Sequence, residues 1–255
     1  MKKNYEEIFH TVLSENTYQL SSSFDGYEVC AGKASRNSYL IVGDTEAILF
    51  DLSLAESDLV SYAEKLSTKP VRIVLSHAHV DHIFNAEKTN ELWLHAGDEK
   101  LLKKGGLFQR AVKPCPNLRF LNDGETIDIG NRTLRVIHIP GHTDGSILLY
   151  DEKTKILFSG DTVARRLLYG LHTYVPVSKF CDRIMELNKL EIAGIYSAHD
   201  RICLPKEHIN YMIDMLTNCI PKKAKIKNFL VFKLVTFSDG KETDIRYFDF
   251  MGLKK

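Results

Sequence analysis

Four side chains that can bind a metal ion occur within six residues of this chain, directly after an apolar run. The run is Val71–Leu75, and the cluster comprises His77, His79, Asp81 and His82. A short apolar run predicts a β-strand, so we expect the cluster at the carboxyl end of that strand. Imidazole nitrogens and carboxylate oxygens together suit zinc, iron and manganese. The pattern therefore indicates metal-assisted hydrolysis before the fold is known.

The spacing within this cluster bears on the number of ions. His77 and His79 are two residues apart, so their side chains point to the same side of an extended strand. Asp81 and His82 follow where the chain has to turn. A single ion cannot easily take all of these ligands from so short a loop, whereas two neighbouring ions can. We therefore expect a pair of ions, each with further ligands from elsewhere in the chain.

Three later segments place a histidine or an aspartate in a turn directly after an apolar strand. The residues are His142, Asp161 and His199, and a glycine precedes the first two. Glycine allows the backbone to turn sharply and to approach an ion closely. These three residues are therefore the candidates for the remaining ligands.

The order of predicted elements repeats once along the chain. Segments 38–51 and 146–161 each form a predicted hairpin that ends near an aspartate, and each precedes a helix and then a strand that ends in histidine. Chance similarity among β-rich segments is the alternative, but the order of elements repeats as well as the residues. We expect strands at 27–31, 37–42, 46–51, 71–76, 92–95, 133–139, 146–150, 155–159, 192–197, 229–237 and 243–250, and helices that begin near Leu59, Ser178 and Pro205.

With these motifs in order, the chain resembles the metallo-β-lactamase-fold hydrolase superfamily over about residues 25–215. The motifs are His77-x-His79-x-Asp81-His82, Gly141-His142, Gly160-Asp161 and Ala198-His199. The resemblance implies an α/β fold, a four-layer αββα sandwich made of two ββ-helix-β halves, with a dinuclear site at one edge. It also implies that His77, His79 and His142 bind the first ion, that Asp81, His82 and His199 bind the second, and that Asp161 bridges both.

The same resemblance indicates the class of reaction. The full ligand set is typical of glyoxalase II-like thioesterases, lactonases and related esterases or phosphodiesterases, whereas true β-lactamases generally lack the carboxylate of Asp161. It implies two divalent ions, zinc first and iron or manganese as alternatives, with a hydroxide between them that attacks a small-molecule ester, thioester or lactone. Asp81 would orient that hydroxide or shuttle its proton. A phosphodiester is the second choice of substrate, and a non-catalytic metal- or ligand-binding module is the alternative from another class.

Several other residues are candidates for supporting roles. Asp51 ends a strand of the first half, so it either accepts a hydrogen bond from a ligand histidine or serves as a helix cap or turn residue. Tyr169 and Tyr174 are candidates for a substrate-binding hydroxyl, because lactonases often carry a tyrosine shortly after the bridging aspartate. His172 lies between them, in a loop expected over the site, where it is either a substrate contact or a mobile loop residue. His138 alternates with apolar residues and is expected to pack in a sheet rather than to bind metal.

Composition limits the partners and the location. The net charge of +1 provides no field to attract nucleic acid or an anionic membrane, so neither is expected as a partner. Five scattered cysteines and an N-terminus without the apolar core of a signal peptide favour a cytoplasmic protein with reduced thiols. We expect a single domain over residues 1–255 that ends in a β-hairpin at about 229–250, with Asp239-Gly240 at its turn. Its aromatic residues suit either a core or an interface, so a homodimer is one of two alternatives.

Overall fold

The structure is a computed structural model that describes residues 8–22, 28–29, 32–33, 35–54, 58–107, 109–228, 232–239 and 244–250. Its strands are β1 (Ile8–Ser14), β2 (Thr17–Ser22), β3 (Glu28–Val29), β4 (Gly32–Lys33), β5 (Asn37–Val42), β6 (Ala47–Phe50), β7 (Val71–Val74), β8 (Glu91–Leu94), β9 (Asn117–Phe120), β10 (Thr126–Asp128), β11 (Thr133–His138), β12 (Ile147–Asp151), β13 (Ile156–Gly160), β14 (Arg166–Tyr169), β15 (Gly194–Ser197), β16 (Lys225–Asn228), β17 (Phe232–Ser238) and β18 (Asp244–Phe250). Its α-helices are α1 (Leu59–Ser67), α2 (Glu99–Lys104), α3 (Val177–Glu186), α4 (His208–Asp214) and α5 (Ile220–Lys223).

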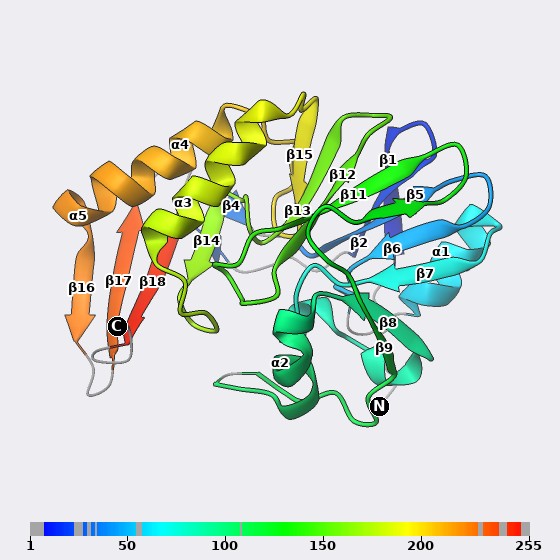
Figure 1. Ribbon diagram of the computed structural model, residues 1–255, viewed down its shortest axis with the longest axis horizontal. Helices are drawn as coiled ribbons and strands as arrows, with labels where there is room; N and C mark the ends of the chain where they lie inside the picture. The colour runs from blue at the N-terminus through cyan, green and yellow to red at the C-terminus, as the bar shows by residue number, and fades with distance from the viewer. Residues whose placement is uncertain are drawn as a thin grey trace.

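Two sheets face each other in the centre of the molecule. The first has seven strands in the order β1-β2-β5-β6-β7-β8-β9, and the second has five in the order β10-β11-β12-β13-β15. Figure 1 shows α3 and α4 on the outer side of the second sheet and α1 on the opposite side of the molecule. The expected four-layer αββα sandwich is therefore confirmed.

The buried side chains divide according to these layers. Phe50 and Phe158 belong to a cluster that fills the space between the two sheets. Leu49, the neighbour of Phe50 in β6, instead packs in a second cluster with Ala63 of α1. Phe180 of α3 belongs to a third cluster on the outer side of the second sheet. Because both faces of β6 are covered, this strand is apolar along its whole length rather than alternating.

The repeat predicted from the sequence is present in the strand pairing. In the first half β5 pairs antiparallel with β6, and α1 then connects β6 to its parallel neighbour β7. In the second half β12 pairs antiparallel with β13, and α3 lies in the connection from β13 to its parallel neighbour β15. The halves differ in one respect, because the second carries the additional strand β14 between β13 and α3.

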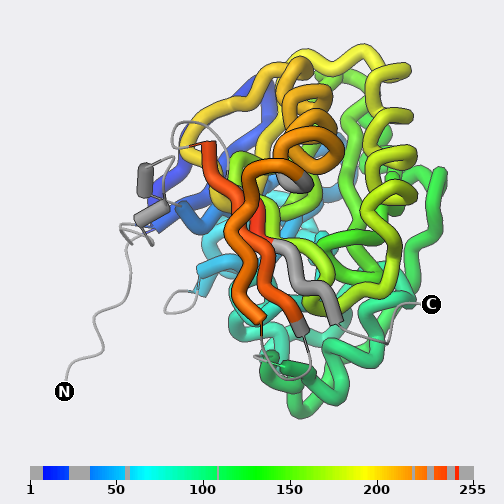
Figure 2. Tube along the Cα trace, turned by 90° about the vertical axis from the view of Figure 1, so that its left-hand side faces the viewer, coloured from blue at the N-terminus to red at the C-terminus, as the bar shows by residue number. Residues whose placement is uncertain are grey.

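A third sheet joins the end of the described chain to the second half. Its order is β14-β18-β17-β16, with β14 parallel to β18 and the other neighbours antiparallel. Figure 2 shows β16 to β18, in orange and red, on the face turned toward the viewer. The predicted hairpin at 229–250 corresponds to β17 and β18, and its residues 229–231 and 240–243 lie outside the described residues. No helix among the described residues is long and apolar enough to cross a membrane.

Several element boundaries differ from the sequence-based expectation. Helix α3 begins at Val177, one residue before the predicted start near Ser178, and Pro176 is its N-cap. Helix α4 begins at His208 rather than at Pro205, because a turn separates the proline from the helix. Seven strands that the sequence did not indicate are present, namely β1, β2, β4, β9, β10, β14 and β16. Of the strand expected at 27–31, only residues 28–29 lie within the described part of the chain.

Candidate metal centre

The predicted ligands lie on loops at one edge of the two facing sheets. The loop after β7 carries His77, His79, Asp81 and His82, and the loop after β11 carries His142. The other two predicted ligands, Asp161 and His199, follow β13 and β15 directly or within two residues. Because β6–β7 and β13–β15 are parallel pairs, the ends of these strands meet at the same edge.

One glycine is needed for this close approach of the loops. Gly160, directly before Asp161, has a φ of +53°, and a Cβ atom there would lie only 2.7 Å from the side chain of Ser76. A residue with a side chain would therefore push the β13 loop away from the β7 loop.

The structure brings the seven predicted ligands together in three overlapping groups. Within each group the nitrogen and oxygen atoms that could bind an ion all lie within 4.8 Å of one another. The groups are His77, His79 and His142; His77, His82 and Asp161; and Asp81, His82 and His199. We call the first of these the first ligand group and the last the second ligand group.

The first ligand group consists of histidine nitrogens alone. Nε2 of His142 lies 3.0 Å from Nε2 of His77 and 2.7 Å from Nδ1 of His79. All three residues are buried, with at most 8 % of each exposed. Three nitrogen atoms this close together repel one another unless a proton or a cation lies between them.

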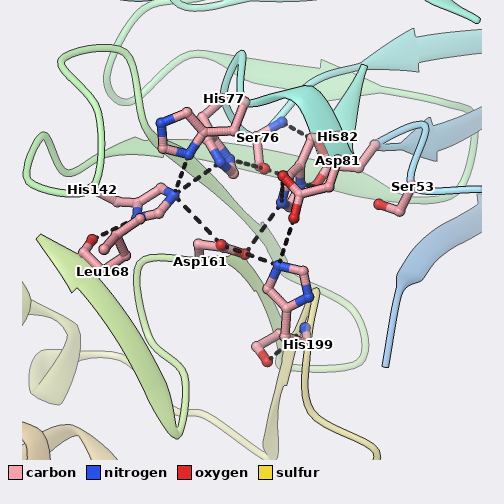
Figure 3. A network of polar contacts seen from close by, with 12 residues as sticks. Ser53, Ser76, His77, Asp81, His82, His142, Asp161, Leu168 and His199 are labelled. Carbon is pink, nitrogen blue, oxygen red and sulfur yellow. Dashed lines mark hydrogen bonds and ion pairs between the residues drawn. The ribbon is translucent and has the colours of Figure 1, made fainter. Parts of the chain in front are cut away.

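Asp161 lies between the two ligand groups, as Figure 3 shows. Its Oδ2 is 3.4 Å from Nε2 of His142 and 3.3 Å from Nε2 of His199, and its Oδ1 is 3.4 Å from Nε2 of His82. Asp81, in the second ligand group, has its Oδ2 3.4 Å from Nε2 of His199. One carboxylate therefore contacts histidines of both groups.

Each of the five ligand histidines uses its other ring nitrogen to contact an outer group. His77 Nδ1 contacts the Ser76 hydroxyl at 2.9 Å, and His82 Nδ1 contacts Asp51 Oδ2 at 2.9 Å. The backbone carbonyls of Leu168 and Ser35 accept from Nδ1 of His142 at 2.6 Å and of His199 at 2.9 Å. His79 Nε2 lies 2.7 Å from Nδ1 of His172.

The oxygen partners assign the tautomers of four ligand histidines, namely His77, His82, His142 and His199. An acceptor at one ring nitrogen requires the proton there, and this leaves a lone pair on the other nitrogen, which faces into the site. Outer acceptors that fix ring orientation are a regular property of metal-bound histidines.

Asp51 is one of these outer groups and lies at the end of β6. Its Oδ1 accepts the backbone N–H of Ser76 at 2.6 Å, and its Oδ2 accepts the Ser76 hydroxyl at 2.7 Å as well as His82 Nδ1. The residue is 1 % exposed and has a φ of +69°, a left-handed conformation that is uncommon outside glycine. Through Ser76 the same carboxylate supports His77, so Asp51 contacts the outer side of both ligand groups.

The electrostatics of the two ligand groups differ. Burial lowers the pKa of His77 and of His79 well below the usual value, and neighbouring histidines lower it further. Burial alone would also lower the pKa of His82, but Asp161 and Asp51 outweigh it and raise the pKa to about 10. In the same way Asp161 and Asp81 raise the pKa of His199 well above its usual value, against the effect of burial.

The cluster fits a divalent ion on its own geometry. Two buried atoms that face the centre, Nε2 of His82 and Oδ1 of Asp161, have no hydrogen-bond partner among the described residues. Buried polar atoms are normally paired, so unpaired ones that converge on a point indicate a missing partner. A cation would satisfy these two atoms and the crowded nitrogens of the first ligand group together.

Sequence reasoning missed one residue that connects two of the ligand-bearing loops, those after β7 and β11. Asp98, 1 % exposed, accepts the Ala78 N–H, the Thr143 hydroxyl and the Gly145 N–H, each at 2.8 Å. Burial raises the pKa of its carboxyl to about 6, although the three donors act against this. The signal that would have revealed Asp98 is the one used for the ligands, an acidic residue shortly after an apolar strand, here β8.

The residues predicted to contact substrate are placed differently from one another. Tyr169 is 0 % exposed, its ring lies 5.1 Å from that of Phe180, and its hydroxyl donates to the carbonyl of Val175. The structure therefore corrects the interpretation of Tyr169, because its hydroxyl is used within the core. Tyr174 is 62 % exposed, whereas His172 contacts His79. His138 lies outside all three groups. Its ring stacks on that of His95, with 3.6 Å between the ring centroids.

Comparison with known proteins agrees with this arrangement. The sequence pattern of the metallo-beta-lactamase superfamily matches residues 31–176 of the chain. The chain belongs to this superfamily. Among solved structures of the superfamily, the metallo-beta-lactamase from Pontibacter korlensis superposes with a TM-score of 0.67 at 17 % sequence identity. The superposition covers 83 % of this chain and 100 % of the other, and at that identity it shows the shared fold.

Two relatives whose names give a hydrolytic activity are similar in sequence. The acyl-coenzyme A thioesterase MBLAC2 of Homo sapiens is 28 % identical over 188 residues, which cover 59 % of this chain and 67 % of the relative. The hydroxyacylglutathione hydrolase of Francisella philomiragia is 28 % identical over 169 residues, which cover 64 % of this chain and 62 % of the relative. With the histidine and aspartate cluster in place, the chain is a metal-dependent hydrolase.

Proposed function

We propose that this protein hydrolyses a small-molecule thioester with a pair of divalent ions held by the seven clustered ligands. The observation that supports a pair of ions is the position of Asp161, whose carboxylate lies within 3.4 Å of His142 on one side and of His82 on the other. A mononuclear site would need neither this bridging carboxylate nor the second ligand group. Zinc suits the ligand set best, and iron and manganese are the alternatives.

The choice of a thioester draws on the relatives. One is named as a thioesterase and the other as a hydrolase of an acylated glutathione, and both match this chain at 28 % identity. A carboxylic ester or a lactone presents the same carbonyl centre, so these are the neighbouring substrate classes.

Different residues of the chain have different roles in the proposed reaction. Divalent ions bound in this site would lower the pKa of a coordinated water and polarise the substrate carbonyl. His77, His79 and His142 are buried, so solvent does not reach the site from the first ligand group. Their lone pairs face the centre of the site. Asp161 orients both groups from between them.

Asp81 is the ligand nearest to solvent. Its side chain is 33 % exposed, against 17 % for His199 and 11 % for Asp161. Burial alone would raise the pKa of Asp81, but a hydrogen bond from His199 and the charge of His82 lower it overall. An ionised carboxylate on the open side can hold the proton of the attacking water and direct its lone pair at the substrate.

A substrate panel on metal-reconstituted protein tests the proposal. We expect thioester hydrolysis to exceed ester, lactone and phosphodiester hydrolysis, and we expect Asp161→Ala to abolish turnover and to reduce the binding of both ions. The matched control is Asp182→Asn on α3, whose side chain is 65 % exposed. Unchanged turnover in Asp161→Ala would refute the bridging role, and fewer than two bound ions in the wild type would refute the dinuclear site.

A further inference from the structure

One short segment contacts the outer side of two of the three histidines in the first ligand group. This segment, Arg166–His172, comprises β14 and the loop after it. The carbonyl of Leu168 accepts from His142 Nδ1 at 2.6 Å, and His172 Nδ1 lies 2.7 Å from His79 Nε2. In the second ligand group, the outer partners of His82 and His199 are instead Asp51 and Ser35.

The direction of the hydrogen bond between the two imidazoles follows from the geometry. His79 Nδ1 and His142 Nε2 lie 2.7 Å apart inside the ligand group, and with a cation bound there both would present lone pairs to it, so the proton of His79 belongs on Nε2. His79 Nε2–H therefore donates, and His172 Nδ1 accepts. In this arrangement His172 holds the ring of His79 with a lone pair toward the site.

Backbone contacts hold His172 in this position. His172 forms a parallel bridge with Thr143, and its carbonyl accepts the N–H of Asp144 at 3.1 Å. On the other side of the ring lies Gly106, where a Cβ atom would come within 3.1 Å of His172 Nε2. The imidazole is thus confined between the His142 loop and the chain at Gly106, in contact with His79.

We infer that His172 is a positioning residue for the first metal ion, acting through the ring of His79. The inference rests on the proposed two-ion function and assigns this histidine to a ligand rather than to the substrate. Partners of this kind set the orientation and basicity of a metal-bound histidine, and losing one typically weakens metal binding about 10- to 100-fold.

The third sheet, β14-β18-β17-β16, supports this segment. Strand β14 pairs in parallel with β18, with Leu168 opposite Arg246 and Tyr169 opposite Tyr247. Strand β18 lies beyond residues 31–176, the part of the chain that matches the superfamily pattern. The first ligand group is therefore supported by a strand outside the matched region.

Zinc titration of the full-length, metal-free protein against a chromogenic chelator tests the role of His172. In His172→Ala we expect the affinity for one of the two zinc ions to fall about 10- to 100-fold while the other is retained. His172→Asn should restore binding, because its Oδ1 can accept in place of Nδ1. Tyr174→Ala, an exposed position in the same loop, is the matched control.

Cobalt provides a second readout that does not depend on turnover. The visible spectrum of the Co²⁺-loaded protein should change in His172→Ala and return toward wild type in His172→Asn. Circular dichroism establishes that each variant is folded. Two zinc ions bound to His172→Ala with wild-type affinity and an unchanged cobalt spectrum would overturn the inference, whereas a wild type that binds fewer than two ions would instead refute the proposed function.

Discussion

The first and second ligand groups differ in burial, in charge and in the structures that support them. His77, His79 and His142 are all nitrogen ligands and nearly inaccessible to solvent, whereas the second group includes Asp81, whose side chain is one-third exposed. The first group is supported by Asp98 and by the segment Arg166–His172, and the second by the backbone at Ser35, while Asp51 supports both, His82 directly and His77 through Ser76. In the proposed two-ion site, the first ion would therefore be enclosed by buried side chains, while the second would face the substrate.

The largest expected effect concerns Asp98, which connects the loop after β7, at Ala78 between His77 and His79, to the loop that carries His142. Asp98→Ala leaves the N–H groups of Ala78 and Gly145 without an acceptor, whereas the Thr143 hydroxyl keeps its contact with Ser146. At about 1 to 3 kcal/mol for each unsatisfied group we expect a loss of about 2 to 6 kcal/mol in the free energy of unfolding. Urea denaturation measures this loss. We also expect weaker binding of one zinc ion. Equal weakening of both ions would show that the two groups are not supported separately.

The next largest effect is expected for a substitution in the third sheet, β14-β18-β17-β16. Ile245 of β18 is 0 % exposed and lies opposite Leu167 of β14. Ile245→Ala should lower the free energy of unfolding by about 2 to 5 kcal/mol, as for other buried large-to-small changes. The matched control is Ile226→Ala in β16, which is 60 % exposed and should have almost no effect. If zinc affinity is unchanged in folded Ile245→Ala, β18 does not support the first group.

Asp51 tests how far the two groups are independent. Asp51→Asn removes the charge next to His82 and, through Ser76, weakens the support of His77. We expect both zinc ions to bind about 10- to 100-fold more weakly, unlike the one-ion effect of His172→Ala. Chelator competition on the two variants side by side makes this comparison. An Asp51→Asn variant that loses only one ion would show that this carboxylate supports only one of the two ligand groups.

The pH dependence of the metal-free protein should have opposite slopes for the two groups. The pKa of His82 is raised to about 10, so its contribution to stability is complete below the unfolded value of about 6.5 and is lost as pH rises toward 10. The pKa of His79 is lowered, so its neutral form favours folding and stability falls as pH drops below about 6.5.

Thermal unfolding between about pH 5 and pH 10 in a chelator measures these slopes. The ordinary pKa of histidine is 6.5. His82→Gln should flatten the pH dependence of stability above this value, and His79→Gln should flatten it below this value. The same slope change in both variants would contradict the electrostatic difference between the groups.

The sequence was sufficient for the central sandwich and for the gathering of the seven candidate ligands. The local pattern places each of these residues after an apolar strand, whereas the sandwich and the grouping of the ligands were implied by the resemblance to the metallo-β-lactamase-fold superfamily. Whether they bind two ions stays a prediction.

Other features depended on contacts distant in sequence. The pairing of β14 with β18 joins segments far apart in the chain, and no local pattern in Arg166–Tyr169 indicates that partner. Tyr169 looked available as a hydroxyl donor near the site, and only the packing of Phe180 and the carbonyl of Val175 show that it is buried. Strand β16 is exposed at every residue, so it lacks the alternation from which a strand is predicted.

The ligands come from both sheets, with His77, His79, Asp81 and His82 after a strand of the first and His142, Asp161 and His199 after strands of the second. An ion held between them is a cross-link across the seam of the sandwich, comparable to a disulfide in position but reversible. Since an unfolded chain has no such site, each bound ion draws the equilibrium toward the folded state by mass action. The lifetime of the loaded protein against heat or proteases should then follow the rate at which the ions leave.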